Sequence, residues 1–519
     1  MNTSIGARPS VGSVRPELVA AAVALALLSA AAARAQTIPF QSSARQTFGT
    51  GLGQEALPRG GVFRPRVETA VQYVDNINTA SKGEKQVDTW GLELAPGFYA
   101  AYSSSSVTAA IDYSVIGRVW DDSDYDNVSQ QGAANGRWIA VPDLFYIDAQ
   151  GSITDNVISP LLGTNYGGLG LFGADNLTQQ AALGVTPTFD RRFGEFNLLA
   201  QYSYGRVWYF DEGDNANQVG FLDQDDSRNQ GAYVSYGNTE SGRKLTGDVF
   251  YEWQKTDYDN ALPYEYEQVG ADVAWQFTPS TALVGRFGIE SDLEKSTSEG
   301  GLDSNFWDVG LRWEPDDRTY AEARYGRRFF GDTYYLNARR TARMFEFWAT
   351  YSESPDVEDQ MLSLGDFNPG ELPPGVPDFN TGSINSDPYV GKNASAGIAA
   401  IGSRTRISLT GYQNVQDYIS NAQNDDTTTG GRFEVTRQLA SNLSADFWVS
   451  YEDYETSRDL GNPPVNFKQS SYDTTLIARL NRTSSGEKLT TTFETGYLNS
   501  AGFDAYDGWW VGLRVRWRP

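Results

Sequence analysis

The sequence of 519 residues contains no cysteine and no histidine. Without cysteine, the chain forms no disulfide and no thiolate metal site. Without histidine, it lacks the usual general base for a serine or cysteine nucleophile and the commonest metal ligand in proteins. We therefore expect no enzymatic activity, no metal centre and no cofactor.

Basic residues are scarce relative to acidic ones. Lysine and arginine together number 41 against 66 aspartates and glutamates, which gives a formal net charge of −25. Phosphate binding requires a basic face, so we expect no nucleic-acid partner. Two interpretations of the acidity stay open: solvated loops, or a surface or lumen that attracts cations. Calcium binding by loop carboxylates is a further alternative, although no spacing in the sequence defines a site.

An apolar run long enough to suggest a membrane segment occurs near the N-terminus. Arg8 and Arg15 precede a run from Leu18 to Ala33, which ends in the small-x-small sequence Ala33-Arg34-Ala35. This order predicts a cleaved secretory signal over residues 1–35, with Ala33 and Ala35 at the cleavage site. A retained helical anchor is less favoured, because a spanning helix needs about 20 residues of a more hydrophobic kind.

Short segments of alternating polarity recur throughout the rest of the chain. Residues 107–119, 143–153, 268–277 and 443–452 each place apolar side chains at every second position and mostly polar ones between, with Ile116 as an exception. A period of two puts these sets on opposite faces of a β-sheet. Lengths of about 9–12 residues suit tilted strands that cross the hydrocarbon of a bilayer.

The connections between these segments are alternately tight and long. The tight ones are Ser103–Ser106, Pro142-Asp143, Arg191–Gly194, Thr239–Arg243, Thr278–Ser280, Glu314–Asp317, Gly402–Arg404 and Thr483–Glu487. The long ones are 121–126, 155–177, 211–228, 292–303, 355–393, 417–426 and 453–470. Short periplasmic turns and longer outer loops are typical of outer-membrane barrels.

These features predict an all-β fold, a transmembrane antiparallel up-and-down β-barrel in the lipid of a Gram-negative outer membrane. The barrel occupies residues 62–519, behind a flexible periplasmic leader at 36–61. Counting the segments gives an even number of about 22 strands, within roughly 18–24.

Many charged residues fall between the apolar positions of the predicted strands. On the lipid face each would cost up to about 2–4 kcal/mol at the bilayer midplane, so we assign them to the lumen. Two compatible interpretations of these charges stay open: ion-pair ladders that stiffen the wall, and a polar conduit. The predicted lumen-facing charges are Asp112, Arg118, Asp148, Asp248, Glu252, Asp272, Arg286, Glu290, Asp308, Arg312, Glu322, Arg324, Arg328, Asp446, Glu452, Glu494, Arg514 and Arg516.

The last segment carries a predicted assembly signal. Gly512, Leu513, Val515 and Trp517 give a glycine, alternating apolar residues and an aromatic residue near the end of the chain. This pattern resembles the C-terminal signal that the barrel-assembly machinery recognises, and departs from it in the two residues, Arg518-Pro519, that follow the aromatic.

Two stretches resemble the PEP-CTERM-system-associated outer-membrane proteins. The first is Val67-Glu68-Thr69 followed by Tyr73–Asn78, and the second is Arg339–Arg343 with Trp348–Glu353. That family is grouped with porin-like barrels and associated with exopolysaccharide loci. The resemblance implies a role in that envelope system and implies no catalytic residues.

The sequence therefore favours a porin-like or secretion-associated passage, with polysaccharide or export proteins as partners. A non-conducting structural or polysaccharide-binding barrel is the alternative, and an outer-membrane enzyme is less favoured. Apolar residues in 155–177 and 355–393 are unusual for loops that face only water. We expect these loops to fold into the barrel mouth and to give a constricted, cation-preferring pore.

The loop asymmetry predicts the topology. With both termini in the periplasm, 355–393 lies outside the cell and Gly402–Arg404 lies inside. Proteolysis of intact cells should cut within 355–393 and spare Gly402–Arg404. Cleavage confined to Gly402–Arg404 would require the opposite orientation.

Overall fold

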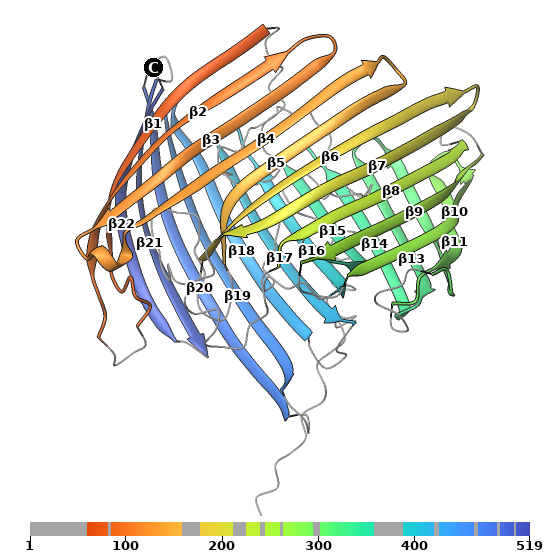
Figure 1. Ribbon diagram of the computed structural model, residues 1–519. Helices are drawn as coiled ribbons and strands as arrows, with labels where there is room; N and C mark the ends of the chain where they lie inside the picture. Colours follow the sequence, from red (N-terminus) through yellow and green to blue (C-terminus); the bar gives the residue numbers. More distant parts are fainter. Residues whose placement is uncertain are drawn as a thin grey trace, which may run out of the picture.

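The computed structural model describes residues 60–80, 85–157, 177–210, 225–238, 244–259, 263–293, 301–357, 388–419, 425–460, 465–484, 488–502 and 505–518. The predicted signal peptide and the leader up to residue 59 lie outside these residues. The described chain forms one antiparallel sheet of 22 strands, each paired with the next (Figure 1). The prediction of an all-β up-and-down barrel is therefore confirmed.

The first half of the barrel contains β1 (Gly60–Val74), β2 (Thr89–Ser103), β3 (Val107–Trp120), β4 (Asn127–Val141), β5 (Phe145–Val157), β6 (Leu177–Phe193), β7 (Phe196–Phe210), β8 (Ser227–Asn238), β9 (Leu245–Tyr258), β10 (Tyr264–Thr278) and β11 (Thr281–Glu290). The second half contains β12 (Ser304–Asp316), β13 (Thr319–Arg328), β14 (Gly331–Thr341), β15 (Phe345–Asp356), β16 (Tyr389–Ile401), β17 (Thr405–Tyr418), β18 (Asp425–Ala440), β19 (Leu443–Leu460), β20 (Val465–Thr483), β21 (Leu489–Gly502) and β22 (Tyr506–Trp517). A short 3-10 helix, η2 (Ser123–Tyr125), follows β3.

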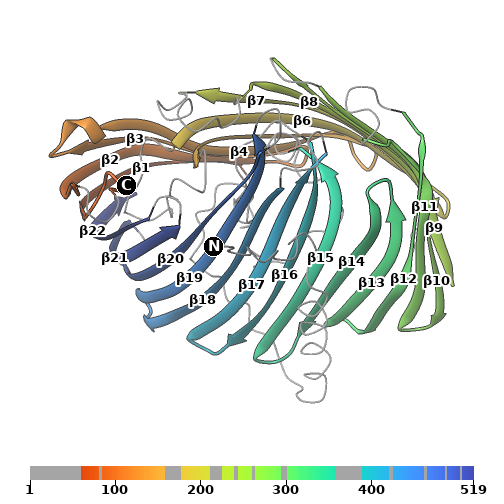
Figure 2. The same ribbon diagram turned by 90° about the horizontal axis from the view of Figure 1, so that it is seen from below.

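The sheet closes on itself between its first and last strands. Residues Val67–Val74 of β1 pair with Trp510–Trp517 of β22, so the seam joins the two ends of the described chain. Figure 2 shows the resulting ring, in which β1 and β22 lie side by side. Closure leaves neither strand with an unpaired edge along this stretch, which is the condition for a sheet to stand in hydrocarbon.

The two ends of the barrel differ in their connections. At the end that holds the start of β1 and the end of β22, called here the terminal end, neighbouring strands are joined by tight turns such as 194–195, 279–280 and 402–404. Gly194 adopts a φ of 65°, which favours glycine. At the opposite, distal end most connections are longer, although residues 329–330 join β13 to β14 directly.

The predicted long connection at 453–470 is wrong. Strand β19 continues to Leu460 and β20 begins at Val465. Beyond the hydrocarbon both faces of a strand meet water, so the apolar alternation that marked the rest of β19 ends near Tyr451 while the backbone ladder continues. For the same reason the predicted loops 155–177, 211–228, 355–393 and 417–426 begin or end inside strands.

No helix among the described residues is long and apolar enough to cross a membrane.

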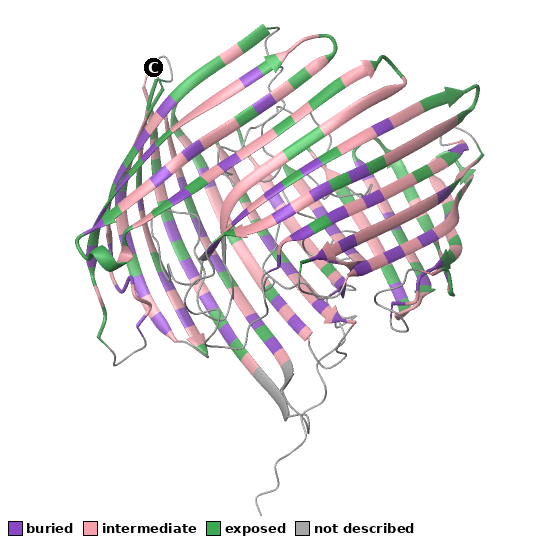
Figure 3. Cartoon of the chain, viewed as in Figure 1, coloured by how far each residue is buried: buried purple, intermediate pink, exposed green. Residues whose placement is uncertain are grey.

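Exposure alternates along the strands, as Figure 3 shows. On β2, Leu92 and Leu94 are 54% and 53% exposed, while Glu93 between them is 4% exposed. The exposed row faces outward and is apolar, and the covered row faces the inside of the ring. Ile116, which broke the predicted alternation, is buried on the inner face.

The seam generates a prediction about assembly. Trp517 pairs with Val67 on β1 and with Leu489 on β21, so deletion of 509–519 leaves one edge of β1, and most of one edge of β21, without a backbone partner. The deletion, and to a smaller extent Trp517→Ala, should reduce the amount of membrane-inserted barrel that shifts on heating in denaturing gels.

Trp275→Ala is the matched control for Trp517→Ala, because Trp275 is 52% exposed and Trp517 is 50% exposed. Trp275 lies in β10, far from the closing strand. Normal insertion of the truncated chain would show that the terminal signal is misassigned.

Candidate functional site: the charged inner wall

The charges predicted to face the lumen all lie on the covered face of the sheet. Each of these side chains is buried or half-buried, and Glu290, Glu322 and Glu494 are at most 1% exposed. Residues paired in register share a face, and several of the predicted charges are direct register partners, such as Arg312 and Glu322. We call this face the inner wall.

One group of charges joins the first and last strands. Arg516 of β22 donates two hydrogen bonds to Glu68 of β1, at 2.7 and 3.3 Å. Arg514 donates to Glu93 of β2 at 3.1 Å, and Arg118 of β3 donates to the other oxygen of Glu93 at 3.0 Å. The seam is therefore reinforced by charge-assisted hydrogen bonds in addition to its backbone ladder.

Small residues let two arginines reach across an intervening strand. Ala70 is the register partner of both Arg514 and Glu93, so the guanidinium passes over a methyl group. Arg66 reaches Asp112 at 2.5 Å over Gly97, where an added Cβ would lie 3.2 Å from the Arg66 Nε and 2.5 Å from a backbone oxygen. A larger side chain at Gly97 would displace this arginine.

Glu494 is the centre of a second cluster on β19 to β22. Arg479 donates to one oxygen of Glu494 at 2.8 and 2.6 Å, and the Trp510 indole donates to the other at 3.0 Å. Nearby, Asn481 donates to Asp446 at 2.8 Å. Glu494 is thus a buried carboxylate whose two oxygens are both hydrogen-bonded.

A third cluster spans β12 and β13. Arg312 and Arg324 donate to different oxygens of Glu322, at 2.5 and 2.6 Å. Arg324 also lies 3.5 Å from Asp308. One buried carboxylate therefore fixes two guanidinium groups against the wall.

Carboxylates outnumber guanidinium groups in one register row across β9, β10 and β11. Asp248 and Asp272 are register partners on β9 and β10. Arg286 of β11 pairs with Asp272 at 3.0 Å. This part of the inner wall therefore has an acidic surplus within the described residues.

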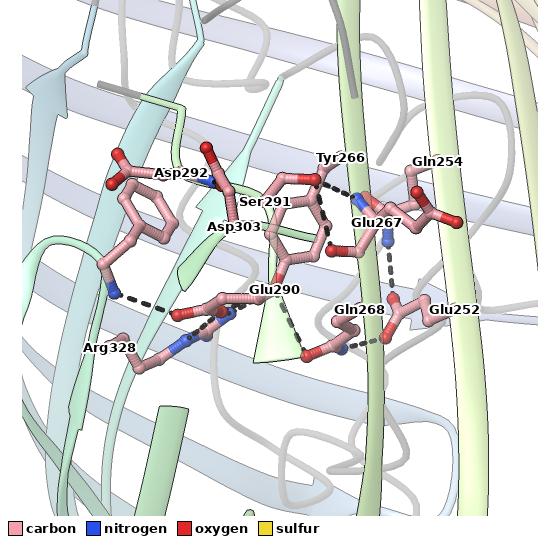
Figure 4. A network of polar contacts seen from close by, with 11 residues as sticks. Glu252, Gln254, Tyr266, Glu267, Gln268, Glu290, Ser291, Asp292, Asp303 and Arg328 are labelled. Atoms are coloured by element: carbon pink, nitrogen blue, oxygen red, sulfur yellow. Dashed lines mark hydrogen bonds and ion pairs between the residues drawn. The ribbon is translucent and has the colours of Figure 1, made fainter. Parts of the chain in front are cut away.

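A further network lies toward the distal end, on β9, β10, β11 and β13. In Figure 4, Arg328, Tyr266 and Glu290 point toward one another. Arg328 donates to Glu290 at 2.7 Å and to the Tyr266 hydroxyl at 2.5 Å, and that hydroxyl donates to Glu290 at 2.8 Å. Gln268 extends the network to Glu252. Glu452 on β19, another of the predicted lumen-facing charges, lies outside this network and accepts a hydrogen bond from Tyr412 at 2.5 Å.

Large aromatic side chains on the inner wall lie over glycines of the neighbouring strand. In each case the aromatic residue and the glycine are register partners, and an added Cβ would meet the ring at 2.1–2.5 Å. These glycines leave room for the ring, and the ring covers the bare backbone. The pairs are Trp120 with Gly91, Trp348 with Gly397, Tyr412 with Gly430, and Trp510 with Gly496.

Several inner-wall residues escaped the sequence analysis. Arg66, Glu68, Glu93 and Arg479 lie on the same face as the predicted charges and pair with them. Alternation was available to identify them; Glu93, for instance, stands between Leu92 and Leu94. Arg137 was also missed, and it donates to Asp148 at 2.6 and 2.9 Å.

Residues Tyr73–Asn78, from the first of the two stretches that resemble a known family, lead into a turn over the distal end of the seam. Asn76 adopts a φ of 62°, and its side chain bonds the backbone of Ala80 and of Asp507 at 3.1 and 2.9 Å. Ile77 is fully buried, and Asn78 accepts a hydrogen bond from the amide of Val87. The stretch therefore ties the β1–β2 connection to β22.

Asp75 makes this turn sensitive to pH. Burial and the neighbouring Asp88 and Asp507 raise the pKa of Asp75 to about 6. The Asp75 carboxyl therefore holds its proton more tightly in the folded turn than in the unfolded chain, where its pKa has the ordinary value near 3.8. The contribution of this group to stability falls as pH rises from about 4 to about 6.

The described residues contain no group of three or more carboxylates placed to hold a metal ion.

The arrangement has the chemistry of a wall between two solvents. The outer face is apolar, the inner wall is charged, and closure satisfies the backbone, which is the condition for a β-structure in a bilayer. The chain is a β-barrel of a Gram-negative outer membrane.

Glu494 generates a prediction about stability. Glu494→Gln removes the charge that compensates Arg479 in a buried position, which typically costs about 3–5 kcal/mol. The temperature at which the folded band is lost in denaturing gels should fall clearly.

Glu434→Gln is the control, because Glu434 is half-buried and lies 3.8 Å from Arg432. A loosely held pair of this kind contributes less than about 1 kcal/mol. Equal shifts in the two variants would contradict the assignment of Glu494 as the centre of its cluster.

No protein-family model matches the sequence, and no curated protein matches it. Among solved structures, the chain is similar to the FrpB iron transporter from Neisseria meningitidis, with a TM-score of 0.40, 6% identity, and coverage of 88% of this chain and 82% of that chain. It is also similar to a mutant ferric enterobactin receptor, PfeA, from Pseudomonas aeruginosa, with a TM-score of 0.46, 11% identity, and coverage of 89% of this chain and 81% of that chain. For Pseudomonas aeruginosa OprD the TM-score is 0.33 and the identity is 12%, with coverage of 89% of this chain and 96% of that chain. At these values the similarity assigns neither a family nor a function.

Proposed function

We propose that this barrel is a polar passage across the outer membrane, of a porin-like or secretion-associated kind. The observation that carries the proposal is the segregation of side chains: ionised and hydrogen-bonding groups turn inward, and apolar groups turn outward. Fixed charges on the wall replace part of the hydration of a passing solute, while the apolar face holds the barrel in lipid. The mechanism is passive and requires no covalent chemistry.

The inner wall favours cations over anions. In the part of the wall that the structure describes, Asp248 and Asp272 lie in one register row with Arg286, which leaves a negative surplus at that level. The formal charge of −25 extends the same sign to the chain as a whole. A wall of one dominant sign raises the local concentration of the opposite ion.

The physiological setting that we propose is an exopolysaccharide envelope system of the PEP-CTERM type. The support is the resemblance of Tyr73–Asn78 and Arg339–Arg343 to stretches of that family. The first of these forms a hydrogen-bonded turn at the seam, which gives its residues a structural reason to be retained. Polysaccharide or an export protein is the proposed partner, and the barrel-assembly machinery is the proposed partner during insertion.

A second candidate is a structural barrel that conducts nothing. The observation that favours it is the pairing of the inner-wall charges, since clusters such as Glu322 with Arg312 and Arg324 stiffen the wall whether or not solute passes. Such a barrel would act through its distal loops, as a scaffold or a polysaccharide-binding surface.

Conductance in planar bilayers tests the passage. We expect the purified barrel to give small, cation-preferring conductance steps, and deletion of 360–385 to raise their size several-fold. The loops 155–177 and 355–393, to which we assigned the constriction, lie largely outside the described residues. Insertion of the deletion variant is checked by its heat-modifiable band.

Three results would contradict parts of this proposal. An absence of steps from correctly inserted protein would favour the structural barrel. Steps that prefer anions would contradict the role of the acidic surplus. Unchanged conductance after deletion of 360–385 would place that loop outside the mouth and leave the constriction to 155–177.

A further inference from the structure

The outer face of β18 to β21 carries a groove of about 380 Å³. Its floor is formed where two alanines, Ala445 and Ala478, replace the large apolar side chains that cover most of the outer face. Phe447, Leu480 and Phe493 stand around them. Asp446 and Arg479 alternate with these residues and turn their side chains to the inner wall, where they belong to the Glu494 cluster.

The strand register produces this shape. Ala445 pairs with Leu480, and Phe447 pairs with Ala478, so each alanine lies beside a large side chain of the next strand. Leu480 in turn pairs with Phe493 on β21. The two alanines lie on a diagonal between large side chains, and this arrangement forms the groove in the lipid-facing surface.

Two arginines stand at the terminal end of this groove. Arg437 lines it and pairs in register with Ala445. Arg482 lies on the outer face of β20, one pair beyond Leu480, beside Leu443. Both side chains are exposed, and within the described chain neither has an ion-pair partner. With strands about 4.8 Å apart, both side chains can reach one group placed between them.

We propose that this groove binds an anionic phospholipid of the periplasmic leaflet, with one acyl chain over Ala445 and Ala478 and the phosphate between Arg437 and Arg482. An arginine on the lipid face costs little only near the interface, which is where both residues stand. Guanidinium groups match phosphate oxygens in geometry and charge. The groove supplies apolar contact for the chain that the phosphate carries.

The leaflet follows from the end of the barrel. Both arginines lie at the terminal end, where the short turns and both ends of the described chain lie, and short turns are periplasmic in outer-membrane barrels. The periplasmic leaflet is built of phospholipid, so a phospholipid rather than a lipopolysaccharide is the occupant. The site lies on the outer face of the barrel, whereas the proposed passage runs through its inside, so lipid binding does not depend on conduction.

Native mass spectrometry of the full barrel, delipidated in detergent and titrated with phosphatidylglycerol, tests the site. Each cationic side chain contributes about 1 kcal/mol to binding an anionic lipid, so the double variant Arg437→Gln and Arg482→Gln should weaken binding about thirtyfold. Ala478→Phe, which fills the groove and keeps both arginines, should weaken it as well. The exposed outer-face residue Arg191, on β6, provides the control Arg191→Gln, which should bind normally.

Three outcomes would overturn the proposal. Equal weakening by Arg191→Gln would mean that any basic residue near the interface attracts the lipid. Normal binding by Ala478→Phe would mean that the groove is not used. Tighter binding of purified lipopolysaccharide than of phosphatidylglycerol, lost in the double variant, would assign the site to the other lipid class. Heat-modifiability of every variant confirms that the barrel is folded in each measurement.

Discussion

The hydrocarbon core of a membrane offers no hydrogen-bond partners, and this constraint orders the rest of the structure. Each unpaired backbone group would cost several kcal/mol there, so the sheet has to close. Closure depends on one seam, Val67–Val74 against Trp510–Trp517. The charges of Arg516 with Glu68, and of Arg514 with Glu93, lie beside that seam. Strands from opposite ends of the described chain are held together where a failure of pairing would expose two edges.

Closure then determines which way the charged side chains within the hydrocarbon turn. Because a strand alternates its faces, a charge placed between two outward apolar residues has to turn inward. A fully covered carboxylate on the inner wall loses its water and requires a partner, and Glu494 and Glu322 each receive hydrogen bonds from an arginine and a second donor. Ala70 and Gly97 have their roles in the same scheme, since their small size allows arginines to cross a strand. The wall is therefore fixed laterally by side chains as well as by its backbone.

The sequence predicted what depends on local alternation and missed what depends on register. Strand existence and the face of each predicted charge follow from period two, and they could be inferred for residues such as Asp272 and Arg514. Partners could not, because the pairing of Arg514 with Glu93 joins residues 421 positions apart. The loop prediction at 453–470 failed because strands that leave the hydrocarbon lose the apolar signal and keep their ladder. The outer groove could not be predicted either, because its shape depends on the register of four strands, which the sequence does not give.

The contrast between the two faces also shows what the two arginines beside the outer groove lack. On the inner wall, Arg479 and Arg312 each lie within hydrogen-bond distance of a carboxylate. On the outer face, Arg437 and Arg482 stand beside an apolar groove, and within the described chain neither pairs with a carboxylate. At the edge of hydrocarbon an anion stabilises a guanidinium, and the described part of the wall supplies none to these two arginines. The membrane has the missing group in its phosphates, so the lipid completes on the outside the ion pairing that the protein completes on the inside.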